Sequence, residues 1–225
     1  MKPLQPIKPS GRPAMRKKAA RILDQLYQLY PDAHCALIYD NPFQLLIATI
    51  LSAQCTDVQV NKVTVGLFAK YSSVQALAEA DLQTLEGDIR STGFYRNKAK
   101  SLLGCAQMLL REYDGQVPQT LSELVRLPGV GRKTANVVLG NVFGIPGMVV
   151  DTHVKRLSRR FAWTDQQDPE KIEEDLSQLL PRKHWVQASH LLIYHGRQLC
   201  KAPIPFCSRC PLLKDCPQRG VDRAN

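Results

Sequence analysis

The sequence predicts an all-α fold. Along most of the chain, apolar residues recur at the spacing of one helix face, and residues that cap helices precede these segments. Nowhere do apolar and polar residues alternate as they do in a half-buried strand. The 225 residues, 44% of them hydrophobic and 22% charged, suffice for one large or two small globular domains. We expect about nine or ten helices and at most one or two short extended runs, such as residues 148–150.

Local signals place each expected helix along the chain. Residues 14–30 form the first, because their apolar side chains share one face and Pro31 ends the pattern. Later helices begin after capping residues, which are Asn41, Thr56, Asp81, Thr120, Asp151 and Asp168. The expected segments are 43–51, 57–70, 82–93, 94–113, 121–127, 132–143, 152–163, 170–180 and 184–200. Asp114-Gly115 ends the longest of them.

Charge is unevenly distributed along the chain. Lys and Arg exceed Asp and Glu by ten, and seven of these charges lie in residues 1–21, which contain no acid. Residues 1–13 carry four prolines and are expected to form a mobile, extended, basic tail. Because the remaining chain is only slightly basic, overall charge alone does not indicate a nucleic-acid partner. We find no apolar run long enough to span a membrane and no secretion signal, and an odd count of seven cysteines suits a reducing, cytoplasmic compartment.

Four cysteines close to the C-terminus form the strongest pattern. Cys200, Cys207, Cys210 and Cys216 follow the spacing C-x6-C-x2-C-x5-C. Four thiolates can hold a tetrahedral zinc ion or a cubane iron–sulfur cluster, and a disulfide pair is a further alternative. Zinc ribbons use two C-x2-C pairs and only one is present here, so the wide intervals favour the larger cluster. The isolated cysteines are expected to be core or boundary residues, and they are Cys35, Cys55 and Cys105.

A glycine-rich turn joins two of the expected helices at about residues 121–143. It contains the sequence Leu127-Pro128-Gly129-Val130-Gly131-Arg132-Lys133. Two glycines let the backbone approach a phosphate closely, and the first N–H groups of the next helix can bind it. The alternative is a turn whose only duty is packing.

Lys133 and Asp151 are candidate catalytic residues. Lys133 lies in the first turn of its helix beside Arg132, where the helix dipole and the like charge favour a neutral, nucleophilic amine. Its alternative role is a phosphate contact. Asp151 is first of all a helix cap, although a carboxylate at a helix start can also stabilise developing positive charge or move protons. Four basic residues follow it and form either a solvated face or a phosphate-binding patch, and they are Lys155, Arg156, Arg159 and Arg160.

Taken in this order, the motifs resemble those of the endonuclease III family, which are DNA glycosylases with abasic-site lyase activity. The matching motifs are L-P-G-V-G-R-K-T-A, V-D-T-H, the cysteine spacing, Asn41-Pro42-Phe43, Leu51-Ser52-Ala53-Gln54 and Thr92-Gly93-Phe94. Together they cover about residues 14–217. The resemblance implies a helix-hairpin-helix glycosylase fold with two helical domains and a DNA-binding cleft between them. A six-helix barrel would span 35–145, and 14–34 with 146–225 would form the other domain and hold a [4Fe-4S] cluster on the four cysteines.

The resemblance also implies roles for individual residues. Lys133 would attack C1′ of an extruded, oxidised pyrimidine nucleotide in double-stranded DNA, with support from Asp151, and β-elimination on the resulting Schiff base would cleave the strand 3′ of the abasic site. Gln54 and Phe94 would fill the space that the nucleotide leaves. The remaining residues implied to bind DNA are Gly129, Val130, Gly131 and Arg132, with His153 at the border of the site. We expect a monomer, because no heptad seam is present.

Several of these assignments have alternatives. Without the resemblance, Gln54 is a loop residue, Phe94 a buried aromatic and His153 a structural histidine. Phe94 also departs from the smaller aliphatic residue that is more common in the family. The related adenine-mismatch glycosylases carry a catalytic Glu before the position of Gln54, and residues 46–51 contain no acid. A third interpretation is an iron–sulfur protein that binds damaged DNA without turnover, which the intact catalytic pair opposes.

Overall fold

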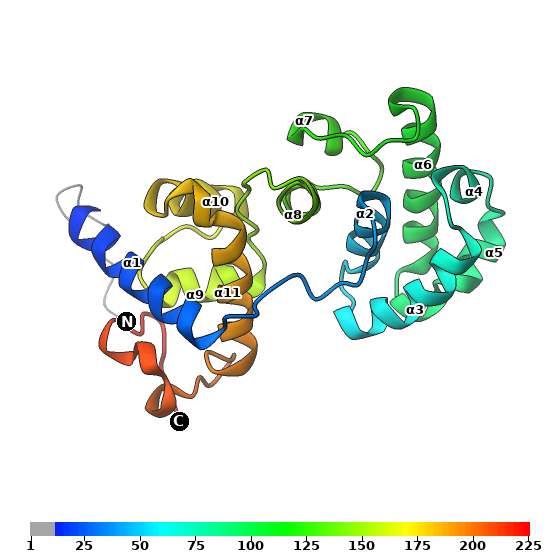
Figure 1. Ribbon diagram of the computed structural model, residues 1–225. Helices are drawn as coiled ribbons and strands as arrows, with labels where there is room; N and C mark the ends of the chain where they lie inside the picture. The colour runs from blue at the N-terminus through cyan, green and yellow to red at the C-terminus, as the bar shows by residue number, and fades with distance from the viewer. Residues whose placement is uncertain (1–11) are drawn as a thin grey trace. The chain divides into compact units, whose positions relative to one another are not determined.

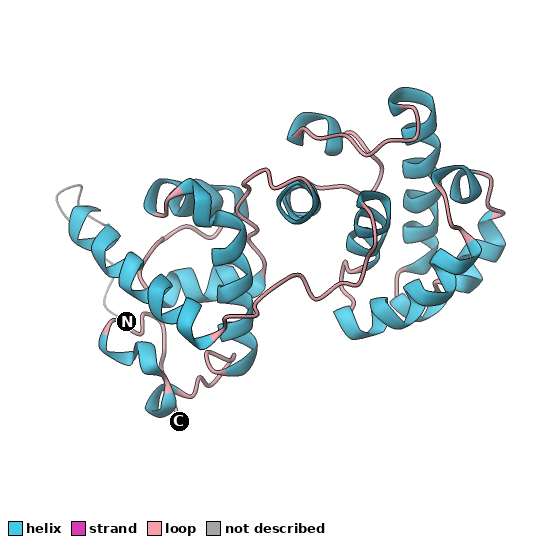
Figure 2. Ribbon diagram, in the orientation of Figure 1, coloured by secondary structure: helices cyan, strands magenta, loops and turns pink. Residues whose placement is uncertain are grey.

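The computed structural model describes residues 12–225 as helices joined by loops (Figure 1). Figure 2 shows no strand among them, and the apolar run 148–150 has no regular structure. The expected all-α class is therefore confirmed. Most of the expected basic tail lies outside the described residues, but Arg12 and Pro13 already belong to the first helix. That part of the expectation is wrong, because a proline is tolerated within the first turn of a helix.

Two compact units make up the chain. One combines the residues before Cys35 with residues 146–225, and the other is Cys35–Ile145. The chain therefore leaves the first unit and returns to it, as the blue helix α1 and the yellow-to-red C-terminal helices show (Figure 1). These boundaries coincide with those that the resemblance implies. Each unit has its own cluster of buried apolar residues.

The first unit is built around helices from both ends of the chain. Its α-helices are α1 (Arg12–Leu29), α9 (Thr152–Arg160), α10 (Pro169–Leu179) and α11 (Trp185–Gln198), and its 3₁₀ helices are η3 (Arg182–His184), η4 (Cys207–Arg209) and η5 (Pro211–Lys214). The apolar face of α1 packs into the same core as residues of α9, α10 and α11. Ile22 and Leu26 of α1 are fully buried, in agreement with the helical spacing of the sequence.

The second unit contains α2 (Pro42–Leu51), α3 (Asp57–Lys70), α4 (Val74–Ala78), α5 (Leu82–Asp88), η2 (Arg90–Thr92), α6 (Tyr95–Tyr113), α7 (Leu121–Leu124) and α8 (Arg132–Val142). These are seven α-helices rather than the six that the resemblance implies. The unexpected one is α4, whose five residues are too few to show a periodic pattern. Eight of the ten residues of α2 are buried, because this helix is apolar on every face.

Capping residues begin the helices as the sequence predicts. The side chains of Asn41, Thr56, Asp81, Thr120, Asp151 and Asp168 each accept a hydrogen bond from a backbone N–H of the first turn. Each cap satisfies at least one of the donors that a helix start leaves unpaired. None of the helices within residues 12–225 combines the length and apolar character that a membrane crossing requires.

Candidate functional site

The glycine-rich turn lies between α7 and α8. Gly129 has a φ of 78°, and a Cβ atom at this position would lie 2.7 Å from Cβ of Ser101 on α6. Backbone angle and space therefore both require glycine. Val130 is buried in the core of the second unit, so its side chain anchors the turn and only its backbone can contact a ligand. Gly131 is the N-cap of α8 and has no side chain to accept from the first-turn N–H groups, a place that an anion can take.

Lys133 is the second residue of α8, and its side chain is exposed. It directly follows Arg132, which is also exposed. The structure thus presents an amine to solvent within the first turn of a helix whose preceding turn can bind phosphate. This is the placement that the sequence predicts.

Asp151 begins α9 in the first unit. One carboxylate oxygen accepts a hydrogen bond from the N–H of Val154 at 2.8 Å, so the expected capping role is confirmed. A capping carboxylate still has a second oxygen for other chemistry. The two candidate catalytic residues belong to different units of the chain, since Lys133 lies in Cys35–Ile145.

The basic residues of α9 only partly match their expected role. Arg160 has an exposed fraction of 6%, and its guanidinium donates to the carbonyl oxygens of Cys200 at 3.1 Å and Lys201 at 2.9 Å. Arg156 is half-buried and donates to the carbonyl oxygen of Cys200 as well. For these two residues the expected solvated face or phosphate patch is wrong, because their side chains fasten α9 to the cysteine-rich segment.

His153 packs within the first unit. Its Nδ1 lies 3.0 Å from Nη2 of Arg156. The ring also packs closely against Gly196, where an added Cβ atom would lie 2.8 Å from the same Nδ1. Burial lowers the pKa of His153 below its ordinary value. These contacts favour the structural role of this histidine over a direct DNA contact.

Gln54 and Phe94 are both exposed and both have left-handed backbone angles, with φ of 53° and 50°. Such angles are uncommon for residues other than glycine. Phe94 has an exposed fraction of 64%, so its interpretation as a buried aromatic is wrong. An apolar ring held in solvent on a constrained loop is available for stacking.

The four cysteines of the C-terminal motif line one cavity, together with Arg160 and His195. Sγ of Cys200 accepts a hydrogen bond from Arg160 at 3.1 Å, and Sγ of Cys210 lies 3.5 Å from Nε2 of His195. None of the seven cysteines is in a disulfide. Cys105 is buried and Cys35 and Cys55 pack against the core of the second unit, as expected.

The four thiols line one cavity, which is the arrangement that the ligands of one shared metal centre require. The preference for an iron–sulfur cluster over zinc rests on the spacing of the motif, which contains only one C-x2-C pair.

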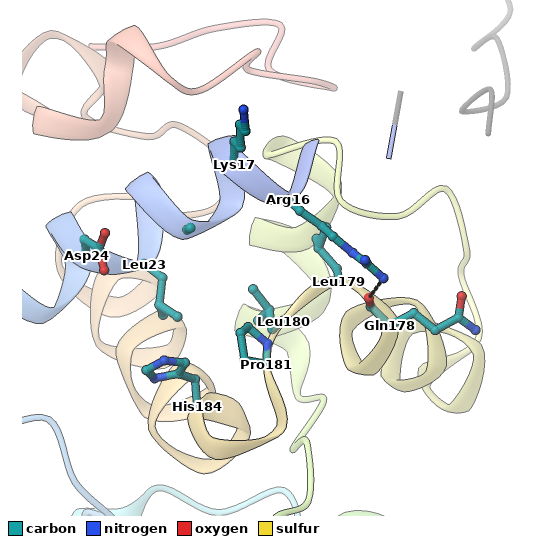
Figure 3. A pocket seen from close by; sticks show the side chains of 10 residues that line it. Arg16, Lys17, Leu23, Asp24, Gln178, Leu179, Leu180, Pro181 and His184 are labelled. Atoms are coloured by element: carbon teal, nitrogen blue, oxygen red, sulfur yellow. Dashed lines mark hydrogen bonds between the residues drawn. The ribbon is translucent and has the colours of Figure 1, made fainter. Parts of the chain in front are cut away.

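A second cavity of about 510 Å³ lies between α1 and the end of α10 (Figure 3). Its walls are mostly apolar, and Arg16 crosses its rim to donate to the carbonyl oxygen of Gln178 at 2.9 Å. Neither candidate catalytic residue nor any cysteine lines it. This second cavity is therefore separate from the predicted catalytic residues and from the cysteine motif.

Two buried basic residues have positions that the sequence does not reveal. The sequence predicts Arg160 as part of a basic patch, and Lys98 of α6 belongs to the polar residues of an amphipathic helix. Both are buried, with exposed fractions of 6% each. A basic side chain at a position that should face the core is the only sequence signal that could have identified them.

Comparison with known proteins identifies the family. Residues 47–182 match the HhH-GPD superfamily of base excision DNA repair proteins. Endonuclease III of Synechocystis sp. is 53% identical over 203 residues, which cover 90% of this chain and 93% of that protein. A non-covalent endonuclease III–DNA complex contains a chain of 46% identity with a TM-score of 0.87, covering 90% of this chain and 95% of that one. A trapped endonuclease III–DNA covalent intermediate, the estranged-adenine complex, matches with the same identity and TM-score over 90% and 96% of the two chains.

These matches cover nine-tenths of the chain. They agree with the sequence motifs, with the glycine-constrained turn before Lys133 and with the cavity that the four cysteines line. The chain therefore belongs to the HhH-GPD superfamily and, within it, to the endonuclease III family.

Proposed function

We propose that this protein is a bifunctional DNA glycosylase and abasic-site lyase of base excision repair. It removes oxidised pyrimidines from double-stranded DNA and then cleaves the strand 3′ of the abasic site. The observation that carries the proposal is the exposed Lys133 in the first turn of α8, directly after the turn that Gly129 constrains. The 46% identical endonuclease III that was trapped as a covalent intermediate with DNA supports it.

In the proposed reaction, the neutral amine of Lys133 attacks C1′ of the extruded nucleotide. The bond between C1′ and the base breaks, its electron pair leaves with the base, and the base takes up a proton. The nitrogen gives one proton to a base, the bond between C1′ and O4′ breaks as O4′ takes up a proton, and the sugar opens to a protonated Schiff base. Loss of a proton from C2′ then expels the 3′ phosphate, and water releases Lys133 by hydrolysis of the Schiff base.

Asp151 supports the first step in this proposal. Its carboxylate stabilises positive charge on the sugar or takes a proton from the amine of Lys133. Because one oxygen is held by the N–H of Val154, the carboxylate has a fixed orientation. In this proposal the other oxygen is the one that acts on the sugar or the amine.

Most of the proposed DNA contacts come from the second unit. Gln54 and Phe94 occupy the space that the flipped nucleotide leaves, which helps to offset the lost stacking. Backbone N–H groups of Gly129 to Arg132 bind phosphate, and Val130 takes part through its backbone only. His153, two residues after Asp151, borders the site, and its ring packs against Arg156.

The four C-terminal cysteines are proposed to hold a [4Fe-4S] cluster. When bound, it supplies iron–thiolate bonds that cross-link the segment from Cys200 to Cys216. Lys201 and Arg209 in this segment lie over the ring of Phe206, at 5.4 and 4.9 Å from its centre. The segment can thus hold two cations in place for DNA phosphates. The protein is proposed to act as a monomer in the cytoplasm, where its DNA substrate is found.

Borohydride trapping tests the function. Wild-type protein, Lys133→Gln and Lys171→Gln are each mixed with a duplex that contains one thymine glycol, and sodium borohydride is added. We expect a covalent protein–DNA adduct with the wild type and with Lys171→Gln, whose exposed lysine lies on α10. Lys133→Gln is expected to give none, because reduction captures only a Schiff base of the nucleophile.

Two outcomes would contradict the proposal. An adduct with Lys133→Gln at the wild-type yield would assign the nucleophile to another amine. If all three proteins bind the duplex and none is trapped, the chain binds damage without turnover, and the alternative of a damage-binding protein takes precedence.

A further inference from the structure

Two loops of the second unit present exposed side chains from strained backbone. Gln54 lies three residues after the end of α2 at Leu51, and Phe94 lies two residues after the end of η2 at Thr92. Both residues have positive φ angles without being glycine. A non-glycine residue persists in this conformation only when its surroundings hold it there.

Both loops are fastened by one buried cation. The ammonium group of Lys98 donates to the carbonyl oxygens of Leu51 and Thr92, each at 2.8 Å. The backbone N–H of the same residue donates to the carbonyl oxygen of Phe94 at 3.1 Å. Lys98 therefore contacts the last residue of α2, the last residue of η2 and Phe94. We call Gln54 and Phe94 the wedge residues, because they are proposed to fill the space that the flipped nucleotide leaves, and we call the loops that carry them the wedge loops.

Helix-end electrostatics explain why a lysine fits this position. The last carbonyl groups of a helix have no partner within the helix, and they carry the negative end of its dipole. Lys98 meets two such ends at once and acts as a cap for both. Burial lowers the pKa of Lys98, because a charge that is taken out of water loses its hydration. Methionine would fill the same space without this cost, so packing alone does not account for a lysine.

The glycine-rich turn rests on the same helix. Ser101, one turn after Lys98 on α6, lies where a Cβ at Gly129 would meet its Cβ at 2.7 Å. The first turns of α6 thus support the turn before Lys133 and both wedge loops. All of these contacts lie within the unit Cys35–Ile145.

We propose that Lys98 is a positioning residue for nucleotide extrusion: its ammonium group ties the ends of α2 and η2 together and so holds Gln54 and Phe94 in the geometry that fills the vacated space in the duplex. This inference rests on the proposed function, and it adds a residue that touches neither the substrate nor the reacting atoms. It explains how one side chain sets the conformation of two loops that are 40 residues apart in sequence.

Single-turnover excision tests the proposal. Lys98→Met is expected to slow excision of thymine glycol from a duplex by about 10- to 100-fold, because the wedge residues lose their alignment. Strand cleavage at an abasic site in a single-stranded oligonucleotide is expected to change by less than about threefold, since there is no partner strand to hold open. Lys100→Met, an exposed lysine two residues further along α6, is the matched control and is expected to change neither rate.

A double-mutant cycle separates positioning from a general structural role. In a Gln54→Ala, Phe94→Ala background the wedge is already absent, so Lys98→Met is expected to cost less than about threefold in duplex excision. Full additivity of the two losses would overturn the proposal, as would an equal loss on duplex and single-stranded substrates. If Lys98→Met does not fold, the same comparison with Lys98→Gln decides the question.

A measurement without catalysis distinguishes this proposal from the proposed function. A duplex with 2-aminopurine opposite a tetrahydrofuran abasic analogue changes fluorescence when the wedge inserts. We expect wild type and Lys100→Met to give the full change and Lys98→Met to lose most of it while still binding the duplex. If the wild type shows this fluorescence change but excises no base, the proposed function is refuted and the positioning role of Lys98 is supported. A full change with Lys98→Met would refute the positioning role.

Discussion

At the scale of single residues, glycine is indispensable where backbone angle and space both exclude a side chain. Gly129 and Gly144 have similar φ angles, 78° and 65°. Only Gly129 is also crowded, because a Cβ at Gly144 would find no atom within 4 Å. Substitutions at the two glycines can therefore separate two contributions to the free energy of unfolding. One is the strain of a left-handed backbone, which both positions have, and the other is the displacement of α6, which only Gly129 requires.

Gly129→Ala is expected to lower the free energy of unfolding by about 1 to 3 kcal/mol. It should also weaken binding to an undamaged duplex, because the turn that presents its N–H groups to phosphate must move away from Ser101. Urea unfolding and fluorescence anisotropy with a labelled duplex measure the two effects. Gly144→Ala is the control, with an expected cost of about 1 kcal/mol and no change in DNA affinity. Equal losses of affinity in the two variants would contradict the role of the crowded turn.

Individual residues differ in how well the sequence reveals them. Lys133 is recognisable because a helix start, two glycines and a basic residue lie next to one another in the chain. The role of Lys98 is hidden, because its two acceptors, Leu51 and Thr92, belong to other segments. Arg160 is hidden for the same reason, since its partners at Cys200 and Lys201 follow about forty residues later.

At the scale of secondary-structure elements, the helix starts are the best-predicted features. A cap is a contact between residues two or three positions apart, so it can be recognised from the sequence without knowledge of the fold. All six predicted caps are observed. The short α4 was missed although Ser73 caps it, because its five residues do not repeat an apolar face.

Asp151 has a capping role and a proposed catalytic role, and these can be separated at the start of α9. Asn caps as well as Asp does, so Asp151→Asn is expected to change the free energy of unfolding by less than about 0.5 kcal/mol. The loss of negative charge should slow thymine glycol excision by about 10²- to 10⁴-fold. Circular dichroism during urea unfolding and single-turnover kinetics give the two values.

The matched control for this change is Asp168→Asn. Asp168 caps α10 by accepting from the N–H groups of Glu170 and Lys171, at 3.0 and 3.1 Å. We expect this variant to keep both stability and excision rate, because it preserves a cap that has no proposed part in the reaction. Wild-type excision by Asp151→Asn would show that the carboxylate charge is not used.

At the scale of the whole molecule, stability depends on two cores that include buried titratable groups. Burial, and then the charge of His34, lowers the pKa of His190 to about 4. A histidine in the unfolded chain has a pKa of about 6.5. Because the pKa of His190 is lower in the folded state, the unfolded state binds more protons than the folded state when the pH falls below about 6.5. The stability that His190 contributes is therefore complete above pH 6.5 and is lost as the pH falls towards 4.

This linkage predicts an acid-sensitive fold. Between pH 7.5 and pH 5, protonation of His190 in the unfolded state is expected to remove about 2 kcal/mol from the free energy of unfolding. His190→Gln should remove this part of the pH dependence, even if it lowers stability at both pH values. Urea unfolding of both proteins at the two pH values measures the difference. An identical decrease in wild type and variant would show that His190 is not the group that titrates.

The sequence by itself determined the all-α class, the helix starts, the glycine-rich turn, the catalytic candidates and the cysteine motif. All of these depend on residues that are close together in the chain, where spacing and capping chemistry act directly. Only the tertiary structure decided that Phe94 is exposed, that Arg160 reaches Cys200 and that Lys98 joins the ends of α2 and η2. These features depend on contacts between segments far apart in sequence, and local spacing carries no information about which distant carbonyl or thiol a buried cation will meet.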